Sequence, residues 1–166
     1  MDEHGLQGEI PRLRRYARAL VGDRAAADDL VQDTLERAWS RRESWQGERP
    51  LRPWLFSVMH NLRIDQLRQA APPAQPLDGT ATDLPTRATQ SDGLELRDLE
   101  AALSRLPEEQ RAVLLLVALE EMSYEAIATT LDIPLGTVMS RLSRGRERLR
   151  RLMAEGASVP HLRIVK

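Results

Sequence analysis

Residues 123–153, SYEAIATTLDIPLGTVMSRLSRGRERLRRLM, carry the clearest pattern of secondary structure in the chain. Ser123 is a good N-cap residue, and the apolar residues after it are spaced as on one side of a helix. Asp132 tolerates a left-handed turn, and Pro134 starts a helix more readily than it continues one. The pattern predicts a short helix, a tight turn and a longer helix, which is the layout of a helix-turn-helix.

The second helix of this pair is amphipathic and strongly basic on its outer side. Its apolar stripe consists of Val138, Leu142, Leu149 and Leu152, with Gly145 among them at a position of close approach. The other sides carry Thr137, Met139, Ser140, Arg141, Ser143, Arg144, Arg146 and Arg148. In a helix-turn-helix such side chains face the major groove of DNA. The alternative is an ordinary pair of amphipathic helices whose arginines are only solvated.

The composition favours an all-α fold and conceals a local separation of charge. Of the 166 residues, 42% are apolar but only 4% are aromatic, so we expect a core of Leu, Ala and Val packed between helices. The formal net charge is −1, yet residues 94–132 hold nine acids against three arginines, and residues 135–151 hold six arginines against one acid. A basic helix within an acidic domain is the charge distribution expected of a nucleic-acid-binding surface.

The types of residue present argue against several classes of protein. The chain contains no cysteine, which excludes disulfides and cysteine-bound zinc, and its three histidines are far apart in the sequence. We therefore expect no cofactor and no metal. No catalytic triad, carboxylate pair or phosphate-binding loop suggests an enzyme. Because no apolar run approaches the length of a membrane span and the N-terminus lacks the features of a secretory signal, we expect a cytoplasmic protein.

The N-terminal half contains three further amphipathic patterns, which predict helices over residues 8–21, 24–40 and 54–68. Gly22 should end the first helix and Asp23 should cap the second. Together they predict a compact domain of three or four helices over residues 1–69. The outer side of the second helix carries Asp29, Gln32, Asp33 and Glu36. Taken alone, this row is typical of an ordinary solvated face.

A polar loop, expected over residues 41–53, contains Trp45. A tryptophan in a charged loop either stacks on a nucleic-acid base or folds back onto the core, and the second is the commoner arrangement. The helix that follows carries polar residues on its outer side: Ser57, His60, Asn61, Arg63, Asp65 and Arg68.

Residues 70–93 differ in composition from the segments on either side. They are rich in Pro, Gly, Ser and Thr and show no apolar periodicity, which predicts a flexible linker between two domains. Helical spacing returns with Leu96, Leu99, Leu103 and Leu106, and Pro107 should begin a new element. Residues 111–119 are apolar nearly all round, as expected for the buried centre of a second domain over residues 94–154. The tail, residues 155–166, is expected to be disordered or to form a small docking strand or helix.

The order of these segments resembles that of bacterial extracytoplasmic-function (ECF) sigma factors, the smallest class of the sigma-70 family. The resemblance extends over most of the chain, from about Pro11 to Met153. Four stretches carry it: DDLVQDTLERAW at 28–39, RPWLFSVMHNLRIDQLR at 52–68, RLPEEQRAVLLL at 105–116 and SYEAIATTLDIPLGTVMSRLSRGRERL at 123–149. Because all four occur in the order of the family, with a linker between the second and the third, the resemblance is specific.

For the N-terminal domain, the resemblance implies two binding surfaces. Asp29, Gln32, Asp33 and Glu36 match the positions that bind core RNA polymerase, at the clamp helices of its largest subunit. The loop 41–48 with Trp45, and the helix after it, resemble the reader of the −10 promoter element, where one base of the single strand is flipped into a pocket. Asn61 suits recognition of a base edge, and Arg63 and Arg68 suit phosphates. His60 stands where a basic residue is usual, so that a phosphate contact there would depend on pH or be absent.

For the C-terminal domain, the resemblance implies a reader of the −35 element. On the polymerase, the parts that the whole chain is expected to contact are the clamp helices and the flap. Met139, Ser140, Ser143 and Arg144 match positions that contact bases in the groove, and Thr137, Arg141 and Arg146 match positions for phosphates or packing. Met139 departs from the lysine or arginine usual there and leaves an apolar contact, for example to a thymine methyl group.

The resemblance implies a transcription initiation factor that is not an enzyme. Its expected partners are core RNA polymerase, double- and single-stranded promoter DNA, and an anti-sigma factor. Two other functions remain open at this point. One is a decoy that keeps the sigma shape only to bind an anti-sigma factor, and the other is a helix-turn-helix repressor that binds operators as a dimer.

Overall fold

The computed structural model describes residues 1–45, 47–70 and 94–164 of the chain. The predicted linker therefore lies outside the described residues, apart from Ala70. In the described part there are seven α-helices and no strand, which confirms the predicted all-α fold. In chain order the helices are α1 (Glu3–Val21), α2 (Arg24–Ser40), α3 (Leu51–Ala70), α4 (Leu94–Ser104), α5 (Glu108–Ala118), α6 (Tyr124–Leu131) and α7 (Leu135–Ile164).

The first two helices are separated by a sharp turn at the predicted residues. Gly22 adopts a left-handed conformation with φ 83°, and its N–H donates to the carbonyl of Arg18 at 3.0 Å, which ends α1. The carboxylate of Asp23 accepts from the N–H of Ala26 at 3.1 Å and caps α2. α1 starts five residues before the predicted position because Asp2 caps it through the N–H of Gly5 at 2.8 Å.

α1, α2 and α3 form a three-helix domain, with α2 packed against both of the others. Their buried apolar residues belong to one cluster that continues into α5, α6 and α7. Tyr16 of α1 meets Phe56 of α3 edge to face, with ring centroids 5.0 Å apart. α3 begins at Leu51, three residues earlier than predicted. Pro53 lies within its first turn, where a missing N–H leaves no helical hydrogen bond unmade.

The helix-turn-helix is confirmed as predicted. Ser123 caps α6 by accepting from the N–H of Ala126 at 3.1 Å, and Asp132 adopts the left-handed conformation with φ 54°. Pro134 directly precedes α7, and its carbonyl accepts from Val138 at 3.2 Å. Val138 and Leu142 are buried, so the first part of the predicted apolar stripe faces the core.

Two details of the C-terminal half go beyond what the sequence pattern predicted. Leu96 belongs to the apolar spacing of α4 but is 57% exposed. The buried residues of this segment, Ala102 and Leu106, lie at its far end, so the first turn of α4 carries its leucine on the surface. Of the tail, for which disorder, a strand or a helix was left open, residues 155–164 are helical and continue α7 to Ile164.

Arg111 connects the start of α5 to the ends of two other helices. Its buried guanidinium donates to the carbonyls of Leu103 at 2.7 Å, Ser104 at 3.0 Å and Leu106 at 2.7 Å, and also to the carbonyl of Leu20 at the end of α1. The last carbonyls of a helix lack the N–H four residues on, and the planar guanidinium supplies several donors to them at once. The carbonyl of Leu103 also accepts from the N–H of Leu106 at 3.1 Å.

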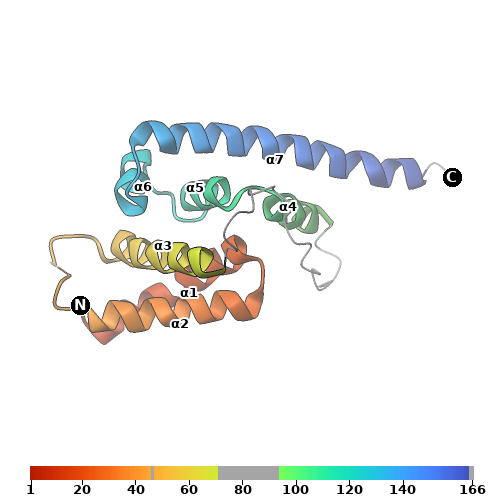
Figure 1. Cartoon of the computed structure of the whole chain (residues 1–166). Coiled ribbons are helices and arrows are strands. Elements are labelled where there is room, and N and C mark those ends of the chain that lie inside the picture. Colours follow the sequence, from red (N-terminus) through yellow and green to blue (C-terminus); the bar gives the residue numbers. More distant parts are fainter. Residues whose placement is uncertain (46, 71–93, 165–166) are drawn as a thin grey trace.

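The two domains contact each other directly, which the sequence pattern did not predict. α3 packs against α6, and α1 packs against α5 and α4. Figure 1 shows the result as layers, with α2 at the bottom, α1 and α3 above it, α4 to α6 above those and α7 across the top. We call this the closed arrangement.

Candidate polymerase and nucleic-acid interfaces

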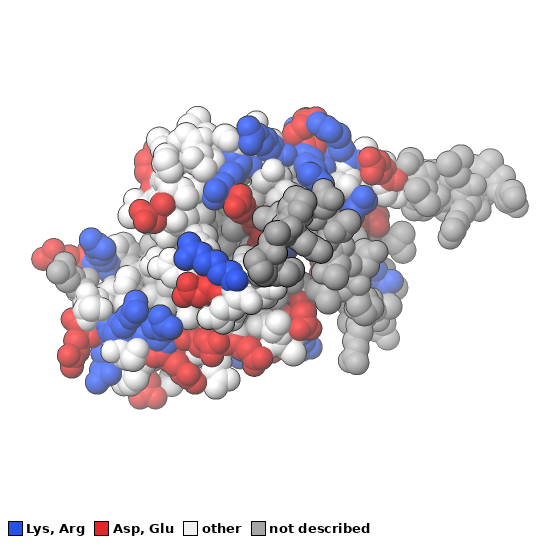
Figure 2. Space-filling view, viewed as in Figure 1, with Lys and Arg blue, Asp and Glu red and all other residues white. Residues whose placement is uncertain are grey.

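The four residues predicted to bind polymerase lie together on the outer side of α2. Asp29, Gln32, Asp33 and Glu36 are all exposed, and the side chain of Gln32 donates to Glu36 at 3.2 Å. Asp28, their neighbour in the sequence, instead lies against α1, where both of its oxygens accept from Arg18 at 3.3 Å. Figure 2 shows a row of acidic side chains along the lower layer, where Figure 1 places α2. Asp28 thus pairs with α1 while its side chain stays 42% exposed, and Asp29, Asp33 and Glu36 lie on the surface of α2.

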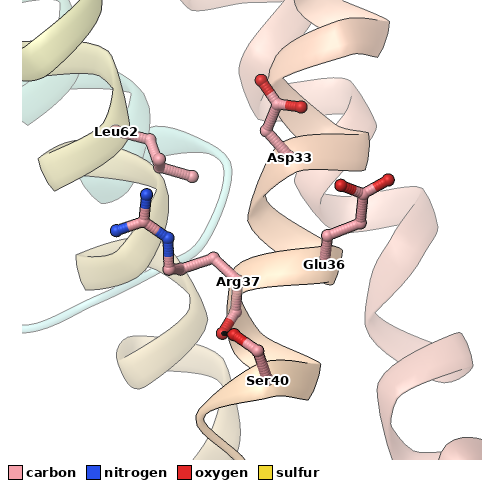
Figure 3. A pocket seen from close by; sticks show the side chains of 5 residues that line it. All are labelled: Asp33, Glu36, Arg37, Ser40 and Leu62. Carbon is pink, nitrogen blue, oxygen red and sulfur yellow. Dashed lines mark hydrogen bonds between the residues drawn. The ribbon is translucent and has the colours of Figure 1, made fainter.

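A groove of about 310 Å³ runs beside this acidic row, between α2 and α3. Figure 3 shows Asp33 and Glu36 on neighbouring turns of α2, and the guanidinium of Arg37 directed across the groove toward Leu62 of α3. Ser40 completes the lining. Arg37 is not among the site residues predicted from the sequence, although its position one residue after Glu36 places it at the edge of the same face.

A second, smaller cavity of about 140 Å³ lies at the loop between α2 and α3. Trp45 lines it together with Ser44, Arg49 and Trp54. The indole N–H of Trp45 is buried and has no hydrogen-bond acceptor among the described residues. A buried donor without a partner is unusual in a folded protein. Arg49 and Trp54 were missed by the sequence analysis, because only the fold of the loop places them beside Trp45.

The predicted −10 residues of α3 differ in their surroundings. Asn61 and Arg68 are exposed, whereas His60 and Arg63 are half-buried against the C-terminal domain. Arg63 forms a fork with Glu108 of α5, with Nε 3.0 Å from Oε2 and Nη2 2.7 Å from Oε1. In the closed arrangement the guanidinium of Arg63 is therefore paired with the carboxylate of Glu108.

His60 lies in an environment that disfavours its charged form. Burial lowers its pKa below the usual 6.5, and the positive charge of Arg141 on α7 lowers it further, while Glu108 and Glu109 on α5 act in the opposite direction. His60 is thus held neutral near pH 7, and one predicted reader of the −10 element lies close to one predicted for the −35 element.

The predicted −35 residues lie on the first half of α7. Met139, Ser140, Ser143, Arg144 and Arg146 are exposed, and Thr137 and Arg141 are half-buried. Arg141 lies 3.7 Å from a carboxylate oxygen of Glu109, which supports the packing role expected for it. Basic side chains gather over the middle of α7 in Figure 2. The helix thus presents a polar and basic surface with two large apolar residues, Leu135 and Met139.

Within the described part of the chain, no group of three or more His, Cys, Asp or Glu residues is placed to hold a metal ion. None of the described helices is both long enough and apolar enough to cross a lipid bilayer.

Two family models match the two helical domains. Residues 6–60 match the family described as the Sigma2 domain of PhyR, and residues 96–149 match Sigma-70, region 4. The chain is thus a protein of the sigma type, with one match in each of its two helical domains.

Full-length comparisons define the family more closely. The chain is 37% identical over 145 residues to the ECF RNA polymerase sigma factor EcfG of Rhodopseudomonas palustris. The aligned region covers 87% of this chain and 80% of the relative. It is also 37% identical over 147 residues to the ECF RNA polymerase sigma factor SigL of Mycobacterium tuberculosis, covering 86% and 83% of the two chains. This chain belongs to the ECF RNA polymerase sigma factors.

A solved structure supports the fold across both domains. The sigma factor RpoE of Bartonella quintana, crystallised in complex with the anti-sigma factor NepR, superposes with a TM-score of 0.74 at 33% sequence identity. The match covers 92% of this chain and 96% of that one. Family membership confirms the prediction of a transcription initiation factor, a class of protein that is not enzymatic.

Proposed function

We propose that this ECF sigma factor acts in the cytoplasm, where it binds core RNA polymerase through α2 and directs it to a promoter with a −10 and a −35 element. The observation that carries the docking assignment is that the acids of α2 differ in their surroundings. Asp28 pairs with Arg18 of α1, whereas Asp29, Asp33 and Glu36 are exposed on the outer side of α2. Carboxylates in such a row suit charge-assisted hydrogen bonds to arginines of a partner.

The −10 element would be read by the loop after α2 and by α3. The cavity beside Trp45 is lined by two indole rings, those of Trp45 and Trp54, which suit stacking on a base. Arg49 at the same cavity supplies a positive charge for the adjoining phosphate. An unstacked base held there would stabilise the opened DNA.

The −35 element would be read by α7. Ser140, Ser143 and Arg144 are exposed on the groove-facing side, with Met139 supplying an apolar contact. Arg146 is exposed nearby and suits a phosphate. Because Met139 cannot form the hydrogen bonds of a lysine or arginine, we expect its base preference to differ from that of relatives with a basic residue there.

An anti-sigma factor is the proposed regulatory partner. RpoE of Bartonella quintana is bound by the anti-sigma factor NepR, and its structure superposes on both domains of this chain. The similarity supports a partner of the same kind here.

The first experiment is run-off transcription with purified core polymerase on promoter fragments from the source genome, with and without the protein. The variant Asp29→Ala/Asp33→Ala should abolish the specific transcripts and the binding to core polymerase. The matched control is Glu95→Ala/Glu100→Ala, which removes two exposed acids from α4 and should leave transcription unchanged.

Three outcomes separate the candidate functions. Specific transcripts that disappear only with the α2 variant support the proposal. An absence of both transcripts and polymerase binding would instead favour the decoy. Tight operator binding by the isolated C-terminal domain, with no effect of polymerase, would favour the repressor.

A further inference from the structure

Two large apolar side chains lie next to each other on the outer surface of α7. Leu135 is 41% exposed and Met139, one helical turn later, is 52% exposed. Residues four positions apart lie on the same side of a helix, so these two side chains form one apolar surface, which we call the apolar pair. The other exposed large apolar side chains of the described residues, Trp39, Leu67 and Leu96, lie on three different helices.

The apolar pair lies where a helix-turn-helix meets the edges of the bases. Leu135 is the first residue of α7, and in this motif the N-terminal residues of the second helix enter the major groove. The other exposed residues between positions 135 and 143 are small, namely Gly136, Ser140 and Ser143. A Cβ added at Gly136 would meet nothing within 4 Å, so this turn is open on its outer side. Among the exposed residues at the start of α7, the apolar pair therefore has the longest side chains.

The chemistry of the apolar pair selects one feature of the groove. Leucine has no hydrogen-bonding side chain, and the thioether of methionine is only a weak acceptor. Among the four bases, thymine alone presents an apolar group in the major groove, the methyl group on C5. Burial of one such methyl group against an apolar side chain strengthens binding about fourfold. The pair therefore favours thymine over cytosine at the bases that it meets.

The spacing of the apolar pair determines how far apart two such thymines can be. Four residues advance about 6 Å along a helix axis, and successive base pairs are about 3.4 Å apart. A helix that follows the groove thus brings the two side chains over base pairs that are adjacent or two steps apart. This distance fits one thymine for each side chain.

The surroundings of the apolar pair favour DNA over a protein as its partner. Arg144, Arg146 and Arg148 follow on the next turns of α7 and are exposed. Figure 2 shows uncharged surface where Figure 1 places the start of α7, and basic side chains farther along the same helix. These arginines suit phosphates, which would hold the start of α7 in the groove. DNA supplies apolar methyl groups and negative phosphates together, which matches this surface.

We propose that Leu135 and Met139 together determine base preference in the −35 element by contacting the C5 methyl groups of two thymines that lie within about two base pairs of each other. This inference rests on the proposed function, in which α7 reads that element, and it adds Leu135 to the residues that select the sequence. Ser140 and Arg144 would read neighbouring bases through hydrogen bonds. Methyl contacts then set the preference at two positions where these side chains offer no hydrogen bond.

The test uses deoxyuridine, which differs from thymidine only by the missing C5 methyl group. Holoenzyme is assembled from core polymerase and the full-length protein, and its affinity is measured for a promoter fragment that gives a transcript in the run-off assay. Each thymine of the −35 element, on either strand, is replaced in turn by deoxyuridine. We expect two of these replacements, at neighbouring positions, to weaken binding about fourfold each and the others to have no effect.

Substitutions then assign each methyl group to a side chain. Leu135→Ala should remove the sensitivity to one deoxyuridine replacement and Met139→Ala the sensitivity to the other, because residues in contact are coupled in a double-mutant cycle. The matched control Leu96→Ala removes an exposed leucine from α4 of the same domain and should keep both sensitivities. All three residues are exposed, so the variants should fold, which circular dichroism checks. Met139→Arg should change the preference at its position from thymine to guanine, which an arginine binds through two hydrogen bonds.

The inference is overturned if no deoxyuridine replacement weakens binding by more than about twofold, the level expected without a buried methyl group. It is also overturned if Leu135→Ala/Met139→Ala responds to the replacements as Leu96→Ala does. If that double variant loses affinity for core polymerase while it keeps the response to deoxyuridine, the apolar pair belongs to a protein contact instead.

Failure of the proposed function has a different signature, because the run-off assay then yields no specific transcript. In that case the full-length protein alone is used to select duplexes from a random-sequence DNA library, and the enriched duplex receives the same deoxyuridine replacements. A loss of affinity at two neighbouring thymines would still support the methyl contacts. An absence of any enriched sequence, or of any response to deoxyuridine, would overturn them.

Discussion

Among the described residues, Glu121 and Asp132 are the two non-glycine residues with positive φ, at 51° and 54°. Asp132 ends α6, and aspartate tolerates this conformation because its short side chain bonds locally. Glu121, in the turn between α5 and α6, has a longer side chain and no such compensation. The left-handed conformation therefore costs more at Glu121 than at Asp132.

Glu121→Gly should raise the free energy of unfolding by about 1 kcal/mol, because glycine adopts positive φ without steric penalty. The control is Glu125→Gly, which removes the same charge but lies in the first turn of α6 and should lower stability by roughly 0.5–1 kcal/mol. Urea denaturation of both variants measures the two effects. A loss of stability in Glu121→Gly would show that the turn is not strained.

At the scale of the helices, the contact between α5 and α7 depends on Gly145. A Cβ added at Gly145 would lie 3.0 Å from Cδ1 and 3.3 Å from Cγ of Leu114, whereas one added at Gly136 would meet nothing within 4 Å. Both glycines lie in α7, so they differ mainly in what faces them. α5 and α7 can approach closely at Gly145 because this residue has no side chain.

Gly145→Val should therefore destabilise the protein by roughly 1–3 kcal/mol through overpacking. Gly136→Val, in the same helix, should change stability by no more than about 0.5 kcal/mol. Thermal denaturation followed by circular dichroism distinguishes the two variants. Equal midpoints would mean that Leu114 moves aside without cost and that Gly145 does not determine the packing distance.

At the scale of the whole molecule, the closed arrangement should depend on pH through His60. The pKa of His60 is lowered by burial and by Arg141, while Glu108 and Glu109 act in the opposite direction. When the two domains are apart, in what we call the open arrangement, the pKa should return toward 6.5. The closed form then binds fewer protons than the open form. Closure is fully favoured above pH 6.5 and weakens as the pH falls below that value.

A fluorescent donor and acceptor can be attached at Ala25→Cys and Ala154→Cys, which are exposed and lie in different domains. The efficiency of energy transfer between them should thus decrease as the pH falls from 7.5 to 5.5. His60→Gln, which cannot titrate in this range, should remove the decrease while leaving the efficiency at pH 7.5 nearly unchanged. A decrease of the same size in His60→Gln would assign the pH dependence to other groups at the interface.

The sequence by itself determined what depends on neighbouring residues. Gly22, Asp23, Ser123 and Asp132 end or cap helices through contacts within four positions, so their roles follow from residue type and spacing. The same holds for the helix-turn-helix and for the exposed acidic row of α2. The stretches that resemble the sigma family are also local, which is why the family could be predicted before the fold was known.

Only the tertiary structure decided what lies across helices distant in the chain. Leu96 has the spacing of a buried residue, but nothing in the sequence indicates where the core ends. Arg63 and Glu108 are 45 positions apart, and Arg12 and Glu120 are 108 apart. Their pairing depends on how two separately patterned domains meet, and periodicity reports only which side of a helix is apolar. The closed arrangement therefore follows from the tertiary structure and not from the sequence pattern of either domain.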